Sequence, residues 1–105
     1  MKREHLEEVT LLQAIGDCFN FHPHSHKARI EFEIVFPNEE RTIWFGKHWS
    51  NVDKCWTYYE GQTNCPTYAH KEKHFLSNLF CGNLNNNLVY SAQQGKFKVY
   101  KVKIS

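Results

Sequence analysis

Three histidines at alternate positions, in the run His22-Pro23-His24-Ser25-His26, are the most unusual residues of this 105-residue chain. Alternate side chains of an extended segment share a face, and neutral imidazole is a common zinc ligand. We therefore take His22, His24 and His26 as candidate metal ligands. Since neighbours on one face lie about 6.6 Å apart along a strand, all three are not expected to bind one ion. The alternative is a solvated, His-rich loop or a pH-sensitive contact.

A second group of metal-ligating residue types occurs later in the chain. His70 and His74 are one helical turn apart, and Cys55, Cys65 and Cys81 lie in the same half of the sequence. No Cys-x-x-Cys pair is present, and nine residues separate Cys55 from Cys65 instead of the two to four of a zinc knuckle. A zinc-stabilised binding module is therefore one hypothesis, and free thiols with solvated histidines are the alternative.

General acid–base chemistry is another hypothesis for these residues. Ribonucleases can cleave a phosphodiester with His, Lys, Glu or Tyr side chains and no metal. The chain has seven histidines and five tyrosines, and its charge is uneven: residues 1–60 carry a net −3 and residues 61–105 a net +5. This division predicts a two-sided electrostatic surface if the two halves do not interleave in space. We find no complete catalytic motif, since no Gly-rich phosphate loop or nucleophile elbow is present.

The densest aromatic segment of the chain indicates binding. Trp44, Trp49, Trp56, Tyr58 and Tyr59 fall within sixteen residues, together with Lys47, His48 and Lys54. Exposed Trp and Tyr side chains beside cations are typical of hot spots in protein interfaces and of platforms that stack single-stranded bases. The alternative is that the tryptophans form the core. The expected partner-binding residues are Trp44, Lys47, Trp49, Trp56, Tyr59, Lys98, Lys101 and Lys103.

The elements that must position these residues are predicted from hydrophobic periodicity. Residues 4–15 have a helical stripe that Gly16 would end, and residues 28–36 alternate as a strand that returns through residues 37–40 into a second strand, residues 41–45. Residues 54–59 form a further strand, which Gly61 would end. Pro66 suits the first turn of a helix that runs to about Phe80, with Tyr68 on its inner side.

The last part of the chain predicts a closing hairpin. Residues 88–92 would pair with residues 96–104, where Tyr100, Val102 and Ile104 face one way, and Phe97 and Val99 predict a bulge or a change of face near Val99. The lysines of this last segment are typical of a protected edge strand or of a phosphate-binding stripe. The predicted fold class is α+β: a mostly antiparallel sheet built from two hairpins, with two helices packed on it, in a single compact domain spanning residues 1–105.

The composition indicates the cellular location and the genetic origin of the protein. Its start is charged, and no apolar run approaches the roughly 20 residues that span a bilayer. We therefore expect a cytoplasmic protein with reduced cysteines, no membrane contact and, zinc apart, no cofactor. Scarce alanine and frequent asparagine, phenylalanine and lysine fit an AT-rich coding sequence of a phage or mobile element.

Together these features favour a small non-enzymatic interaction protein that binds and blocks a host macromolecular complex, a protein or a ribonucleoprotein. In size and composition the chain is similar to small phage-borne inhibitors of host defence, including anti-CRISPR proteins, and it shares no motif with them. The alternatives are an RNA-binding protein or a metal-independent, toxin-like ribonuclease, and a zinc-stabilised binding module.

Overall fold

The computed structural model describes residues 3–37, 40, 42–62, 66–83 and 97–104. Its elements in chain order are β1 (Arg3–Val9), α1 (Leu11–Phe19), β2 (Ile30–Val35), β3 (Thr42–Ser50), β4 (Cys55–Gly61), β5 (Thr67–Ala69), α2 (Glu72–Ser77), a π-helical segment (Asn78–Asn83) that continues α2, and β6 (Lys98–Ile104). Within the described residues neither helix has the length or the apolar composition that crossing a lipid bilayer requires.

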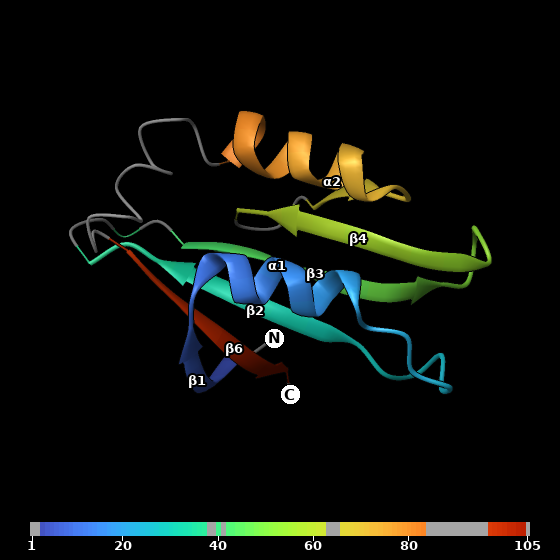
Figure 1. Ribbon diagram of the computed structural model, residues 1–105, viewed down its shortest axis with the longest axis horizontal. Coiled ribbons are helices and arrows are strands. Elements are labelled where there is room, and N and C mark those ends of the chain that lie inside the picture. Colours follow the sequence, from blue (N-terminus) through green and yellow to red (C-terminus); the bar gives the residue numbers. More distant parts are fainter. Residues whose placement is uncertain (1–2, 38–39, 41, 63–65, 84–96, 105) are drawn as a thin grey trace.

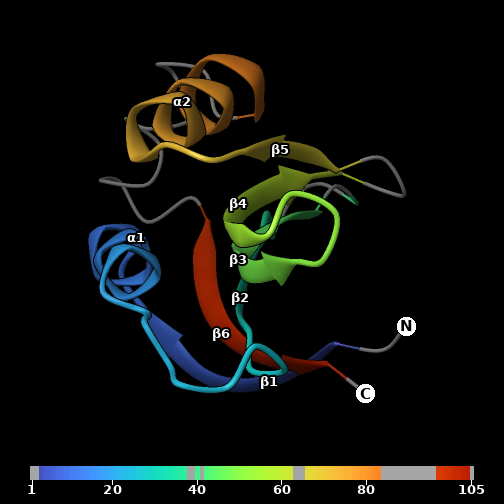
Figure 2. The same cartoon turned by 90° about the vertical axis from the view of Figure 1, so that its right-hand side faces the viewer.

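The strands form one six-stranded antiparallel sheet in the order β1-β6-β2-β3-β4-β5 (Figure 1). The sheet is curved, and Figure 2 shows both helices on its concave side. The fold is therefore α+β with a mostly antiparallel sheet and two helices packed on it, as the sequence predicts. We call the covered side the helix face and the other side the open face.

The core lies between the helix face and the two helices. Strand residues alternate between faces, so Ile30, Phe32 and Ile34 of β2 point toward the helices together with Phe45 of β3, which pairs with Phe32. The two helices cover them with apolar side chains that are almost fully buried: Ala14, Ile15, Cys18, Phe75 and Leu79. Burial of these apolar side chains is the main stabilising contribution of the fold.

The helix expected over residues 4–15 is wrong in its first half. Residues 3–9 form β1, and α1 begins only after Thr10, whose side chain accepts a hydrogen bond from the backbone N–H of Gln13. Pairing with β6 favours a strand over a helix here, because acidic residues of β1 lie opposite lysines of β6: Glu4 pairs in register with Lys103, and Glu7 with Lys101. Gly16 lies inside α1 and does not end it.

The helix expected to start at Pro66 begins later. Residues 67–69 form β5, in which Tyr68 pairs with Tyr59 of β4, and α2 starts at Glu72. Tyr68 is therefore an exposed residue of the open face and not part of the core. Tertiary strand pairing overrides the local helix signal here.

The predicted hairpins have different outcomes. β2 and β3 pair antiparallel over residues 30–35 and 42–47, as expected, and β3 extends further than predicted, to Ser50. Residues 88–92, the first strand of the second hairpin, lie outside the described residues. β6 pairs regularly with β2 through Val99, so the bulge or change of face expected there is wrong, and the register shift lies in β1 between His5 and Glu7.

β6 is an interior strand, which corrects two expectations about charge. It lies between β1 and β2, so its lysines do not protect a sheet edge. Because the basic β6 pairs with the acidic β1, the acidic and basic halves of the sequence interleave in space and do not give a two-sided surface.

Candidate functional site

The open face is organised around a buried carboxylate. Glu31 of β2 is only 2 % exposed although no helix covers it. It forms ion pairs with Arg3 and with Arg29, whose Nη2 lies 3.3 Å from its Oε1, and it accepts a hydrogen bond from the Tyr59 hydroxyl at 2.8 Å. Arg29 also donates to the Tyr59 hydroxyl at 2.8 Å. Charge-assisted hydrogen bonds of this kind are stronger than neutral ones, so the network fixes these side chains.

The two arginines of this network lie over aromatic rings. The guanidinium of Arg3 is 4.7 Å from the centre of the Trp44 ring, and that of Arg29 is 5.3 Å from the Tyr59 ring. Such cation–π contacts are favourable and cover the rings. Trp44 is consequently 8 % exposed and Tyr59 3 % exposed, which removes both expected contact residues from the accessible surface of the free protein.

Gly46 makes room for the Tyr59 ring. A Cβ at Gly46 would lie 2.1 Å from the backbone oxygen of Ile30 and 2.7 Å from the Tyr59 hydroxyl oxygen. A side chain at this position would collide with a neighbouring strand, so the close approach of β2, β3 and the tyrosine requires glycine.

His48 continues this row of side chains toward the edge of the sheet. Its ring packs edge-on against Tyr59 at 4.9 Å and nearly parallel to Tyr68 at 5.8 Å between ring centres. Burial, followed by the nearby positive charge of Arg29, lowers the pKa of His48 below its ordinary value. Its Nε2 is buried and has no hydrogen-bond partner among the described residues.

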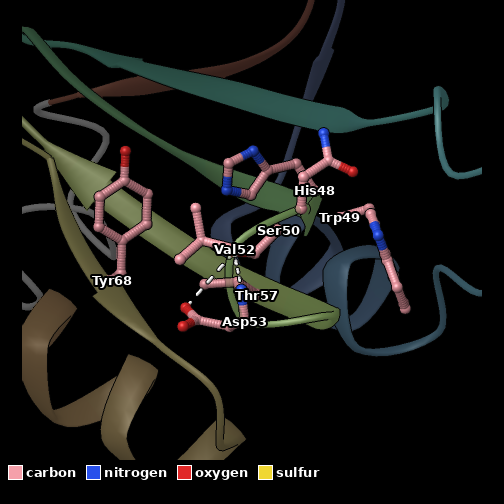
Figure 3. Close-up of a pocket in the computed structure, with 8 residues that line it drawn as sticks. His48, Trp49, Ser50, Val52, Asp53, Thr57 and Tyr68 are labelled. Carbon is pink, nitrogen blue, oxygen red and sulfur yellow. Dashed lines mark hydrogen bonds between the residues drawn. The ribbon is translucent and has the colours of Figure 1, made fainter.

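A hollow of about 510 Å³ opens beside His48 on the open face (Figure 3). It lies between the turn that joins β3 to β4 and the exposed ring of Tyr68, and its lining residues are His48, Trp49, Ser50, Asn51, Val52, Asp53, Thr57 and Tyr68. The size falls within the range of ligand pockets. Figure 3 shows Val52 and Tyr68 beside the His48 ring, whereas the Trp49 ring turns away.

A second hollow of about 640 Å³ adjoins the first. Asp53 and Tyr68 line both, and the second also includes Ala69, His70, Lys71, His74 and Asn78. A ring nitrogen of His70 lies 3.1 Å from an Asp53 carboxylate oxygen, although both side chains are about half exposed. Because the two hollows share Asp53 and Tyr68, they are neighbours, and we call them together the groove; its lining residues extend from His48 of β3 to His74 of α2.

The tryptophans expected to act together lie on opposite faces. Trp44 is on the open face, while Trp49 and Trp56 are cross-strand neighbours on the helix face, with their rings 5.7 Å apart. His26 stacks on Trp49 at 3.6 Å, and Phe21 packs edge-on against Trp56. Trp49 and Trp56 are partly buried at the end of the sheet.

The lysines that were expected to contact a partner also lie on different parts of the molecule. Lys47 is 3 % exposed on the helix face, with its amine 5.1 Å from the centre of the Tyr58 ring, and burial lowers its pKa. Lys98 is exposed and 4.0 Å from a Glu8 oxygen. Lys101 and Lys103 line a separate hollow of about 300 Å³ with Leu6, Arg29, Glu31 and Val102.

The candidate metal ligands do not meet. Across the described ranges of the chain no three His, Cys, Asp or Glu side chains are placed to hold a metal ion. His22, His24 and His26 lie exposed in the loop before β2, where His26 serves as a stacking partner of Trp49. Cys18, Cys55 and Cys81 are free, burial raises the pKa of Cys18 to about 12, and Cys65 lies outside the described residues.

Two features of the open face were not predicted from the sequence, the buried carboxylate of Glu31 and the exposed Val52 of the groove. Glu31 alternates with apolar residues and predicts an ordinary solvated position, because nothing local indicates the two arginines that cover it. Val52 does have a local signal. It is a β-branched apolar residue in a turn whose other residues, Asn51, Asp53 and Lys54, are polar, so its side chain is not expected to be buried in the core.

Comparison with known proteins gives no relative for this chain: no family model, curated protein or solved structure matches it.

Proposed function

We propose that the protein is a non-enzymatic interaction protein that binds a protein or ribonucleoprotein partner through the groove beside the β3–β4 turn. One observation carries this proposal. Val52 is 90 % exposed and Tyr68 is 55 % exposed, and both line the same 510 Å³ hollow. Exposed apolar side chains that gather around a concave site, rather than lying scattered, are typical of interaction surfaces.

The surroundings of the groove suit a protein interface. Polar side chains of Ser50, Asn51 and Asp53 surround Val52, which matches an apolar centre with a polar rim. His70, held by Asp53, extends this rim toward α2. Trp49 and Trp56 lie at the same end of the sheet, and their partly exposed rings would enlarge the contact on the helix face.

We also propose that binding blocks or modulates the partner, as phage-borne inhibitors of host defence do. This part rests on the size and composition of the chain. The lysines of β6 would contribute to steering, because exposed charges speed encounter more than they strengthen the final complex.

RNA binding is the second candidate function, and Tyr68 favours it. Its exposed ring lies between the two hollows, and Lys71, His70 and His74 line the second one. A ring for base stacking beside cations for phosphates is the usual arrangement of single-strand binding sites. Histidines at this site would also serve an acid–base ribonuclease.

The test is capture of the partner from a lysate of the native host with tagged wild-type protein and two variants, with and without RNase. Val52→Asp places a charge in the groove, and Leu12→Asp is the matched control because Leu12 is 83 % exposed on α1. We expect a stoichiometric protein that survives RNase, is retained by Leu12→Asp and is lost with Val52→Asp. Equal capture by both variants would contradict the site, and capture of RNA alone would favour the second candidate.

A further inference from the structure

His48 has a polar atom that the described part of the chain leaves without a partner. Its Nε2 is shielded from solvent and makes no hydrogen bond there, although the ring itself borders the 510 Å³ hollow. Unpaired buried polar groups are rare in native proteins, and each calls for an explanation, of which a functional role is one. Figure 3 shows the His48 ring projecting toward Val52 and Tyr68.

Two aromatic rings and one apolar side chain lie near the His48 ring, and polar residues complete the lining of the hollow: Ser50, Asn51, Asp53 and Thr57. Tyr59 contacts one side of the His48 ring, Tyr68 lies nearly parallel to it, and Val52 stands beside them almost fully exposed. A guest that fits must therefore have an apolar, flat body and one polar atom at its tip. Tyrosine has this form, because its ring is apolar and its hydroxyl seeks a hydrogen bond when buried.

Charges near the hollow select against an ionised tip. The guanidinium of Arg29 lies over the Tyr59 ring, against which His48 also packs, so its positive charge disfavours an ammonium or guanidinium at the tip of the guest. Arg29 is already paired with Glu31, and Asp53 stands at the mouth, so a carboxylate would be buried without a partner. A neutral hydroxyl avoids both penalties.

We propose that a tyrosine side chain of the protein partner binds at the His48 end of this hollow, in the place that the Tyr68 ring holds in the free protein, with its ring against Val52 and its hydroxyl hydrogen-bonded to Nε2 of His48. This inference rests on the proposed function and specifies the chemistry of that same site. A neutral imidazole nitrogen accepts a hydrogen bond from the phenol, so the bond supplies the partner that Nε2 lacks.

Entry of the guest ring requires Tyr68 to turn. Nε2 lies beneath the side chains around it, so the guest takes the place that the Tyr68 ring holds beside His48. Tyr68 belongs to the three-residue edge strand β5 and is more than half exposed, so little packing is lost when its ring moves toward solvent.

The test uses small probes of the guest side chain and NMR titration of the full chain. The probes are p-cresol, which carries the tyrosine ring and hydroxyl, toluene, which lacks the hydroxyl, and uridine as a nucleobase. We expect p-cresol to shift the signals of Val52, Thr57 and Tyr68 saturably, with toluene binding about 5-fold more weakly because it leaves Nε2 unpaired. His48→Phe should remove this preference, and His24→Phe, at an exposed histidine, should keep it.

Three results would overturn the proposal: no saturable binding of p-cresol, equal affinities of p-cresol and toluene in the wild type, or an unchanged preference in His48→Phe. Saturation by uridine without p-cresol would overturn it in favour of a nucleobase. The outcome is separable from that of the proposed function. If Val52→Asp loses the partner but His48→Phe keeps the preference for p-cresol over toluene, only the tyrosine proposal is rejected. If p-cresol binds specifically but no partner is captured, only the proposed function is rejected.

Discussion

Replacing His48 by phenylalanine should stabilise the protein. The wild-type ring has a buried Nε2 without a partner among the described residues, and an unsatisfied buried polar atom costs about 1–3 kcal/mol. Phenylalanine is a ring of similar shape and has no polar atom. Because His48 is only partly buried, we take the lower end of the range and expect a gain of about 1 kcal/mol, or roughly 4 °C in Tm for a domain of this size.

Urea unfolding at two pH values measures this gain. The lowered pKa of His48 means that the folded state resists its protonation, so the wild type loses stability as pH falls below the ordinary value of 6.5. The advantage of His48→Phe should therefore be larger at pH 5.5 than at pH 7.5. His24→Phe is the control, because the same change at an exposed histidine should stay within about 0.5 kcal/mol. A variant less stable than the wild type would show that the buried Nε2 of His48 does not destabilise the folded protein.

Three further substitutions test the interactions that shape the sheet, each by chemical denaturation against the wild type. Glu31→Ala leaves two arginines without their shared carboxylate and should destabilise the fold by about 3 kcal/mol, and a loss under about 1 kcal/mol would show that the network contributes little. Gly46→Ala drives a methyl group into the backbone oxygen of Ile30 and should cost about 3 kcal/mol, so a neutral result would contradict the close approach of β2 and β3. Burial raises the pKa of Glu60 from 4.5 to about 7, so with respect to this group the wild type is most stable below pH 4.5 and loses about 3 kcal/mol as pH rises from 4.5 to about 7. Glu60→Gln should abolish that loss, and an unchanged pH profile would place the pKa of Glu60 near its ordinary value.

Strands with strict alternation were predictable from the sequence. Ile30, Phe32 and Ile34 point to one face in the structure, as period 2 requires, and β2 pairs with β3 as the turn residues between them indicate. Residues 4–9 were not predictable in this way. Leu6 and Val9 fit a helical stripe, and only the lysines of β6, more than ninety residues later, make the strand preferable.

The candidate site was only partly predictable. The aromatic segment does lie at the end of the sheet that holds the groove, but β3 extends five residues beyond Phe45, which places Trp44 and Trp49 on opposite faces. Burial of Trp44 and Tyr59 depends on Arg3 and Arg29, which are distant in sequence. No local pattern specifies such a contact.

Site-specific photo-crosslinking shows whether the groove beside the β3–β4 turn contacts a protein partner. A crosslinking side chain would replace Val52 in one protein and Leu12 in another, since both positions are strongly exposed and lie on different elements. After irradiation in the native host, we predict one protein joined through position 52, with a tyrosine near the attachment point, and no such product from position 12. The same product from both positions, or none from position 52, would contradict the account.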